Sequence, residues 1–196
     1  MEQITLHFTG HTPLLMHRPT TVNPLDPATI ELKKYTGKRK KTEDDHQTIA
    51  RLEWEAGLYH DPEVGPYLPG VNIEVMLRKA GVITKQGTAV TRGVLVPEDR
   101  VPVMYDGPRG TNGKGVQELW DANLKDYRVV GNQQNSVMRC RPCFVPGRGW
   151  EMTVPFVFEP SIIDERDLVA IAERAGTMIG LGDYRPRFGR FAVEVA

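Results

Sequence analysis

The chain has 196 residues, which is the length of one well-buried domain with insertions rather than of two full domains. Lys and Arg together number 25, and so do Asp and Glu, so the net charge of zero gives no sign of a nucleic-acid partner and any basic surface must be local. A hydrophobic content of 40% with 19 Gly and 15 Pro indicates many turns, which favours an α+β chain over a helical bundle.

Neither a membrane span nor a signal peptide is evident in the sequence. No apolar run approaches the length of a bilayer-crossing helix, and the first residues lack the charged head and apolar stretch of a signal peptide. We therefore expect a cytoplasmic protein with no membrane partner.

The N-terminal residues have the pattern of a strand with one buried face. Ile4, Leu6 and Phe8 are apolar and alternate with more polar positions. Four prolines between residues 13 and 27 then interrupt regular structure repeatedly. The fold is thus predicted to open with a strand and to continue as irregular chain.

A basic cluster follows, directly before three acidic residues at 43–45. Two interpretations remain open: a solvated segment that joins a helix to a loop, or a flexible basic finger that closes on a nucleic-acid backbone. The cluster consists of Lys33, Lys34, Lys38, Arg39, Lys40 and Lys41.

Two helices are predicted after the basic cluster. Thr42 is a suitable N-cap for a helix that extends to about Gly57, because acidic residues in the first turn and an apolar stripe follow it. A second helix is predicted over 71–81, where Gly81 is a natural end.

The middle of the chain has strand-like runs and a glycine-rich loop. Residues 89–96 and 101–105 flank a Pro-Glu-Asp-Arg turn as the strands of a hairpin would. The glycine-rich segment 106–115 is predicted to be a loop. It is not a P-loop, because it lacks the G-x-x-x-x-G-K-[ST] spacing that wraps a phosphate.

A second hairpin is predicted nearer the C-terminus. Residues 138–144 and 150–158 both alternate between apolar and polar positions around a turn at 146–149. Arg139 and Arg141 share the face opposite the apolar one. The outer surface of this hairpin is therefore predicted to be basic although the chain is neutral.

The only two cysteines, Cys140 and Cys143, form a C-x-x-C pair within the first strand of this hairpin. Side chains three apart on a strand point to opposite faces, and the histidines that a zinc site would need all lie far upstream. We expect neither a metal site nor a cofactor.

The last elements are a helix and a strand. Residues 164–179 have an apolar face behind an acidic capping segment that begins at Asp164, and residues 191–195 alternate as a strand.

The loop between them, 180–190, contains three glycines, three arginines and two aromatic residues. Glycine permits positive φ and the close approach of a ligand, and arginine presents a planar charged fork to phosphate, so this loop is suited to hold the backbone of a polyanion. The alternative is that Gly180 and Gly182 end the helix and Gly189 marks a bulge. The candidate contact residues are Gly182, Tyr184, Arg185, Arg187 and Arg190, with Tyr184 placed to stack a base.

Without two insertions, at roughly 19–66 and 82–135, the predicted order is strand, helix, two-stranded hairpin, helix, strand. This is the order of the ferredoxin-like or RRM-like (βαββαβ) α+β fold, in one domain over residues 1–196. Fold order alone says little about function.

Three local motifs at fixed places on this order together resemble the RAMP superfamily of CRISPR-associated proteins. Residues 12–16, TPLLM, look like that family's turn of a small residue, Pro and Leu after the first strand. Residues 67–78, YLPGVNIEVMLR, are similar to its "PGSSLKGALR" helix start, although Glu74 replaces a common Lys. Residues 180–189 resemble its C-terminal glycine-rich loop, which touches RNA.

The resemblance implies one of two activities. Backbone subunits of the family bind guide RNA as a filament through a basic groove, and a second branch processes crRNA with an N-terminal histidine as general acid and base. His11 and His17 stand in suitable places for the second activity. As a whole the chain also looks like small proteins of tailed bacteriophages, for which the compartment would be the host cytoplasm.

We favour a non-catalytic protein that binds the sugar-phosphate backbone of single-stranded RNA or DNA and assembles along the strand as a homo-oligomer. The predicted contacts are the loop residues above, Arg139 and Arg141, and the basic cluster at 33–41. Two alternatives are a metal-independent endoribonuclease of the crRNA-processing type and a protein-binding module, such as a mimic of a CRISPR complex or a phage assembly factor.

Overall fold

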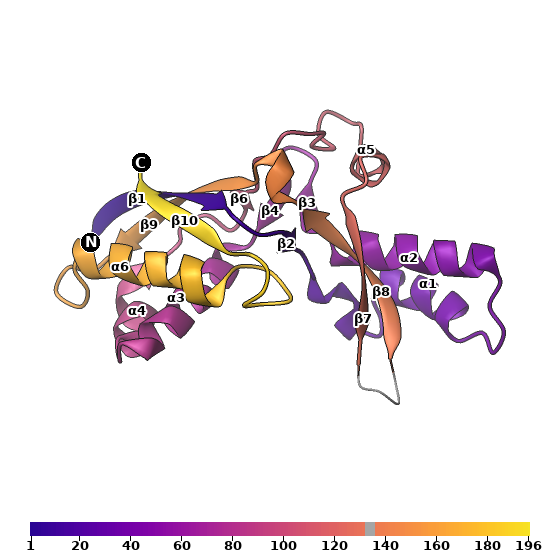
Figure 1. Ribbon diagram of the computed structural model, residues 1–196, viewed down its shortest axis with the longest axis horizontal. Helices are drawn as coiled ribbons and strands as arrows, with labels where there is room; N and C mark the ends of the chain where they lie inside the picture. The colour runs from indigo at the N-terminus through magenta and orange to yellow at the C-terminus, as the bar shows by residue number, and fades with distance from the viewer. Residues whose placement is uncertain (132–135) are drawn as a thin grey trace.

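The computed structural model describes residues 1–131 and 136–196 and has a mixed α+β architecture. Figure 1 shows an elongated molecule with a sheet and its helices at one end and a pair of helices beside a long β-hairpin at the other. The N- and C-termini both lie at the end that holds the sheet. The last four residues of the predicted insertion at 82–135 lie outside the described residues.

The main sheet has four antiparallel strands in the order β10-β1-β9-β5. Leu6 of β1 lies opposite Val195 of β10 and Val154 of β9. The alternation of β1 buries Ile4, Leu6 and Phe8 as predicted, so the first and last predicted strands are confirmed. The strands are β1 (Glu2–Gly10), β5 (Val94–Leu95), β9 (Glu151–Phe158) and β10 (Phe191–Val195).

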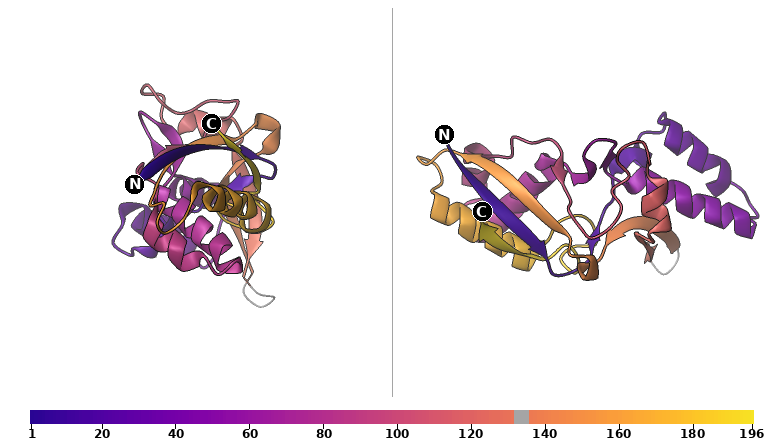
Figure 2. Two further views of the ribbon diagram at one scale, coloured as in Figure 1. Left: turned by 90° about the vertical axis from the view of Figure 1, so that its left-hand side faces the viewer. Right: turned by 90° about the horizontal axis from the view of Figure 1, so that it is seen from above.

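Helices cover one face of this sheet, as the end-on view in Figure 2 shows. They are α3 (Gly70–Ile83), α4 (Gly87–Gly93) and α6 (Glu165–Arg174), and a turn of π-helix at Ala175–Ile179 continues α6. The Asp164 side chain accepts a hydrogen bond from Asp167 N, so Asp164 is the N-cap of α6, within the predicted capping segment. The helices predicted over 71–81 and from Asp164 are thus confirmed as α3 and α6, and α3 continues two residues past Gly81.

The other end of the molecule is a helical pair packed on a hairpin. Helix α1 (Pro27–Thr36) precedes α2 (Glu43–Gly57), whose Thr42 forms a reciprocal capping box with Asp45. The Trp54 indole of α2 donates to Leu124 O at 2.7 Å and thereby ties the helix to the start of the hairpin. The hairpin belongs to a sheet with the order β2-β8-β7, formed by β2 (Leu14–Leu15), β7 (Lys125–Val130) and β8 (Val137–Phe144).

Short elements connect the two ends. The third sheet contains β3 (His60–Asp61), β4 (Gly65–Leu68) and β6 (Val101–Pro102), in that order, and α5 (Gln117–Asp121) follows the predicted loop at 106–115. Two 3-10 turns lie at Pro19–Val22 and Pro146–Arg148.

The predicted hairpin of residues 89–96 and 101–105 is wrong. Most of its first strand is helix α4, and the strands that remain separate: β5 pairs with β9, whereas β6 pairs with β4. Short apolar runs fit either period, and here the buried residues of α4 are Gly87, Val90 and Gly93, spaced three apart as on one side of a helix. Gly81 lets α4 approach, since a Cβ there would lie 3.1 Å from Val90 Cγ2.

The predicted hairpin of residues 138–144 and 150–158 is also wrong in its pairing. Both strands form, but β8 pairs with β7 and β2, whereas β9 pairs with β1 and β5. Gly149 adopts a left-handed conformation with φ 63° after the 3-10 turn, and the chain then enters the main sheet. The predicted partner of β9 was β8. In the structure, β9 instead lies between β1 and β5 in the main sheet.

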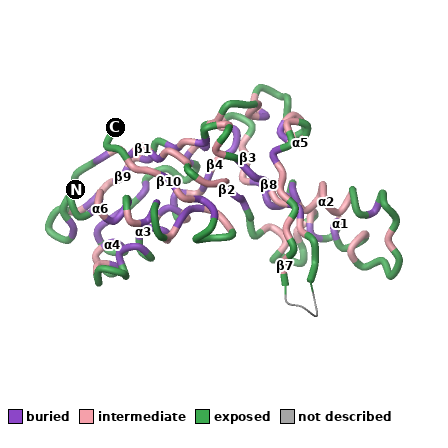
Figure 3. Tube along the Cα trace, viewed as in Figure 1, coloured by how far each residue is buried: buried purple, intermediate pink, exposed green. Residues whose placement is uncertain are grey.

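One large cluster of buried apolar side chains extends through both ends of the molecule. It includes Phe8 and Phe156 of the main sheet, Met76 of α3 and Trp54 of α2. A second, small cluster joins Leu15, Cys143 and Phe188. Figure 3 shows that the connection between α1 and α2, which carries much of the basic cluster, is exposed.

Candidate functional site

The loop at 180–190 is bound along its length to the segment that follows β1. Asp183 N donates to Leu15 O at 2.7 Å, Gly189 N donates to Pro13 O at 2.8 Å, and His11 N donates to Arg190 O at 2.8 Å. Two segments that are more than 160 residues apart in the chain, 11–16 and 180–190, thus form one layer.

The close approach of the loop to Leu15 requires a glycine at position 182. Its φ is 72°, and a Cβ at this position would lie 2.3 Å from Leu15 O. The residue was predicted to be a ligand contact; its backbone conformation and its approach to Leu15 give it a packing role as well.

Asp183 connects the loop to β8 and to His17. Its carboxylate accepts from the Arg141 guanidinium, and His17 Nδ1 lies 3.6 Å from Asp183 Oδ2. Partial burial lowers the pKa of His17, and the neighbouring Arg141 charge lowers this pKa further. The imidazole is therefore mainly neutral at neutral pH, beside an ion pair.

Arg139 also forms an ion pair. Its guanidinium donates to Glu53 Oε1, and the other carboxylate oxygen of Glu53 accepts from Cys140 N at 3.1 Å. The Glu53 side chain is only 8% exposed and that of Arg141 only 13%. The predicted exposure therefore holds for Arg139, whose side chain is 38% exposed, and not for Arg141. Each arginine is paired with a carboxylate, from Glu53 of α2 or from Asp183 of the glycine-rich loop, so the positive charge of this face is largely neutralised.

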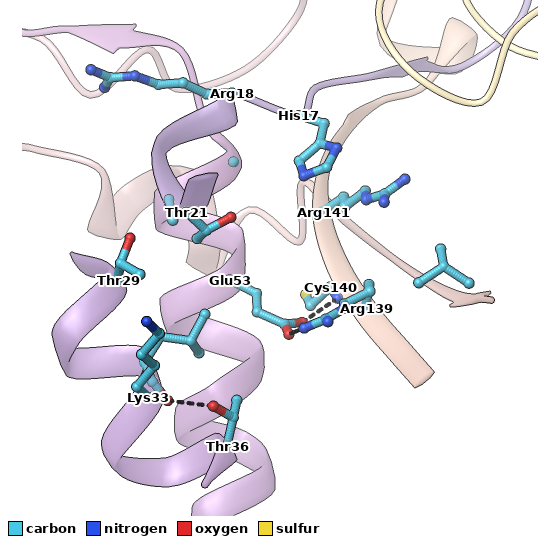
Figure 4. Close-up of a pocket in the computed structure, with 14 residues that line it drawn as sticks. His17, Arg18, Thr21, Thr29, Lys33, Thr36, Glu53, Arg139, Cys140 and Arg141 are labelled. Atoms are coloured by element: carbon cyan, nitrogen blue, oxygen red, sulfur yellow. Dashed lines mark hydrogen bonds and ion pairs between the residues drawn. The ribbon is translucent and has the colours of Figure 1, made fainter. Parts of the chain in front are cut away.

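A hollow of about 470 Å³ lies between the two helices and β8. Figure 4 shows His17 and Arg141 on one side of it and Thr21, Thr29 and Lys33 on the other. Its polar lining consists of His17, Arg18, Thr21, Thr29, Lys33, Thr36, Glu53, Arg139 and Arg141.

A second hollow of about 330 Å³ lies next to the first, and His17 lines both. Its other walls are formed by α3, by the segment after β1 and by the glycine-rich loop. The residues that line it include Met16, His17, Tyr59, Asn72, Val75, Gly182, Asp183 and Arg185. We name the two together the junction hollows.

Most of the basic cluster at 33–41 does not reach the junction hollows. Lys34 Nζ binds Glu31 at 2.5 Å, and Lys38 Nζ binds Asp45 at 2.5 Å. Arg39, Lys40 and Lys41 lie in the connection between α1 and α2 at the far end of the molecule, and the Lys41 amine donates to Lys38 O. Of the six predicted residues, Lys33 alone lines a junction hollow.

The remaining loop residues divide into two groups. Arg185 lines the second junction hollow, whereas Arg187 is exposed outside it and Arg190 donates through Nε to Pro186 O at 2.6 Å. Tyr184 is 41% exposed, and the Arg128 guanidinium lies 4.9 Å from the centroid of its ring. The Phe188 ring also contacts Tyr184, with centroids 5.3 Å apart, so both Arg128 and Phe188 restrict the stacking of a base on Tyr184.

Two residues of the junction hollows, Arg18 and Asn72, were missed by the sequence analysis. Arg18 directly follows His17 in a segment without a periodic pattern, and Asn72 lies within the family-like segment 67–78, where nothing in the sequence sets it apart. His11, the other histidine candidate, lines neither junction hollow.

The face of the main sheet away from the helices does not have the features of an RNA-binding sheet. RRM sheets stack bases on aromatic residues, but this face carries Thr5, His7, Thr153, Glu151 and Glu194 among its side chains, and none of its strand residues is aromatic. His7 Nε2 lies 3.5 Å from Glu151 Oε2.

The thiols of Cys140 and Cys143 are both buried and are not joined in a disulfide. Burial raises the pKa of Cys140 to about 11 and that of Cys143 to about 12, so both thiols stay protonated. Within residues 1–131 and 136–196, no cluster of three or more His, Cys, Asp and Glu side chains is arranged to hold a metal ion. In the same part of the chain, no helix combines the length and apolar character that crossing a bilayer requires.

No protein-family model matches the chain, and no curated protein is significantly similar to it.

Proposed function

We propose that the protein is a non-catalytic binder of single-stranded nucleic acid that holds the sugar-phosphate backbone in the junction hollows. The observation that carries this proposal is the gathering of Arg18, Lys33 and Arg185, from three separate segments, around two adjoining hollows. None of the three makes an ion pair with another described residue. Phosphates would supply the missing negative charge.

The arrangement of the three family-like segments supports the same proposal. Met16 from the first, Asn72 and Val75 from the second, and Arg185 from the third all line the second junction hollow. A surface that joins three distant motifs is a suitable place for a ligand.

The topology of the main sheet supports a ferredoxin-like core of the RAMP type. Its elements occur in the chain order β1, α3, β5, β9, α6, β10, and its strand order is β10-β1-β9-β5. In this proposal the chain is a single domain, and the insertion at 19–66 supplies α1 and α2. The stretch 82–135, predicted as the second insertion, supplies β7 but also contains α4 and the core strand β5. Helix α1 and helix α2 form a wall of the first junction hollow.

Fluorescence anisotropy with labelled RNA and DNA strands of about 16 nucleotides tests the proposal. The variant Lys33→Ala plus Arg185→Ala should bind more weakly, and the slope of log K against log salt should decrease by about 1.4, since each phosphate contact on a single strand contributes about 0.7. The control, Lys114→Ala plus Arg166→Ala, removes one Lys and one Arg that line neither hollow.

An equal salt dependence for the two double variants would contradict the site assignment. Comparison of RNA and DNA strands in the same titrations, and nuclease digestion of any nucleic acid that co-purifies, identifies the type of strand. Protein that is free of nucleic acid and binds no strand at low salt would instead favour the protein-binding alternative.

We also propose that copies of the chain assemble along one strand. Binding to longer strands should then be cooperative, and light scattering should show several copies per strand. A single copy on a strand that has room for several would contradict assembly.

His17 provides the observation that favours a second candidate function, metal-independent cleavage of RNA. It lies between the two junction hollows and its pKa is lowered, so a neutral imidazole is available as a general base. Incubation of a labelled hairpin RNA with EDTA tests this function: cleavage that His17→Ala abolishes and His11→Ala retains would support it. Intact RNA after long incubation with the unaltered protein would exclude it.

A further inference from the structure

A third hollow, of about 340 Å³, lies between α3 and α4, away from the junction hollows. It is formed by surface residues of the two helices and their connecting turn. The side chains that line it include Arg78, Val82, Lys85, Thr88, Thr91 and Arg92. We name it the α3–α4 hollow.

The cations of this hollow lack the carboxylate partners found elsewhere in the protein. Arg78, Lys85 and Arg92 are exposed and make no ion pair with another described residue. Arg139 and Arg141 on β8, by contrast, each bind a carboxylate. Three like charges around one hollow repel one another unless an anion lies among them.

Two carboxylates of the neighbouring helices, Glu74 and Asp167, make other contacts. Glu74 is four residues before Arg78 on α3, the spacing of a helical ion pair, but its Oε1 accepts from Val96 N at 2.8 Å. Asp167 of α6 accepts from the Gln86 side chain at 2.7 Å. Neither carboxylate forms an ion pair with Arg78, Lys85 or Arg92 in the described part of the chain, so these three cations are available to a ligand.

One stripe of α3 connects this hollow to the junction hollows. Asn72 and Val75 line the second junction hollow, and Arg78 and Val82 line the α3–α4 hollow. These positions are three or four residues apart, so they lie on the same side of the helix. Lys79, also exposed, lies on this stripe.

The opposite side of α3 faces the core. Ile73, Met76, Leu77 and Ala80 are fully buried there, so the stripe is the surface that the helix leaves to solvent. From position 72 to position 82 the helix rises about 15 Å, at about 1.5 Å per residue.

We infer that a strand held in the junction hollows continues along this stripe of α3 and places further phosphates in the α3–α4 hollow. Arg78, Lys85 and Arg92 bind phosphate oxygens there, and the exposed Thr88 hydroxyl donates to another. At about 3.4 Å per phosphate in a stacked strand, 15 Å of helix corresponds to about four more nucleotides. This inference rests on the proposed function, since it extends the same bound strand.

The inference predicts a dependence on strand length. Binding is measured for the unaltered protein with strands of about 4, 8, 12 and 16 nucleotides. The variant Arg78→Ala plus Lys85→Ala should bind the shortest strand as the unaltered protein does, and should lose affinity for the longer strands. Its salt slope on long strands should decrease by about 1.4.

Lys114→Ala plus Arg166→Ala again removes one Lys and one Arg and should leave binding unchanged at every length. Thermal unfolding of each variant checks that the fold is intact, which is expected because both target side chains are exposed.

The results separate this inference from the proposed function. If Arg78→Ala plus Lys85→Ala equals the unaltered protein at all lengths while Lys33→Ala plus Arg185→Ala is weakened, the extension along α3 is wrong and the junction site stands. An equal loss for strands of every length would also overturn the extension, because the shortest strands would then bind at the α3–α4 hollow itself. If the unaltered protein binds no strand, both proposals fail.

Discussion

Arg141 and Asp183 form an ion pair that attaches the glycine-rich loop to β8, across 42 residues of sequence. The Asp183 backbone is fixed at the same time, because its N–H donates to Leu15 O. The loop is therefore held on two sides, and these contacts position Arg185, which lines the second junction hollow together with His17.

The first prediction concerns Gly182, which allows the loop to meet β2. Gly182→Ala should lower the free energy of unfolding by more than about 1 kcal/mol, because alanine is strained at φ 72° and its Cβ would lie 2.3 Å from Leu15 O. Thermal unfolding should show a decrease in Tm of at least about 2 °C. Gly147→Ala is the control, since a Cβ there meets nothing within 4 Å. Equal Tm values for the two variants would show that the loop does not need this contact.

The second prediction concerns Glu53, the buried carboxylate of α2. Glu53→Ala should cost about 1–3 kcal/mol of unfolding free energy, since the buried Cys140 N–H and the Arg139 guanidinium both lose their acceptor. Glu55→Ala, two positions along the same helix, removes only an exposed pair with Arg51 and should cost at most about 0.5 kcal/mol. Urea titrations measure both values. A loss for Glu53→Ala as small as that for Glu55→Ala would contradict the role given to this carboxylate.

The third prediction is a pH dependence of stability caused by His17. Burial and Arg141 lower the folded-state pKa of His17 below its value of 6.5 in the unfolded chain. Below about pH 6.5 the unfolded chain therefore binds the proton more readily, and unfolding free energy that is present at higher pH is lost as the pH falls through the folded-state pKa.

Urea titrations at about pH 7.5 and pH 5.5 test this effect. The decrease in unfolding free energy between the two pH values should be smaller in His17→Gln than in the unaltered protein. His46→Gln, which removes an exposed histidine of α2, controls for the loss of an imidazole elsewhere. The same decrease in His17→Gln and the unaltered protein would show that His17 does not cause the effect.

Sequence patterns correctly predicted the elements that depend on interactions between residues close together in the chain. The alternation of Ile4, Leu6 and Phe8 identified β1, and the capping residues Thr42 and Asp164 identified the starts of α2 and α6. Strand pairing is not local, because any two alternating strands satisfy the same pattern. This is why β8 and β9 were predicted to form one hairpin although they belong to different sheets.

The candidate site was predicted in part, for a similar reason. A sequence shows where cations are but not which carboxylates fold against them. Arg185 remains available to a ligand, whereas Arg139 and Arg141 face Glu53 and Asp183, which come from positions 86 and 42 residues away. The three family-like segments do meet around one hollow, a proximity that no single segment reveals.

The last prediction concerns Glu74, where the family-like motif has a common Lys. The Glu74 carboxylate accepts from Val96 N and so binds α3 to the chain just after β5. Val96 is 5% exposed. Glu74→Lys removes the acceptor, because an ammonium group only donates. The Val96 N–H would then lose its partner, at a cost of about 1–3 kcal/mol in unfolding free energy.

Glu74→Gln tests this explanation directly, because its amide oxygen can take the place of the carboxylate oxygen. Urea titrations should show a small loss for Glu74→Gln and a large loss for Glu74→Lys. A large loss in both would mean that the charge of Glu74 matters and not its hydrogen bond. Glu74 binds Val96 N and forms no ion pair with Arg78, so the carboxylate that stabilises this helix leaves the cation on the outer stripe of α3 unpaired.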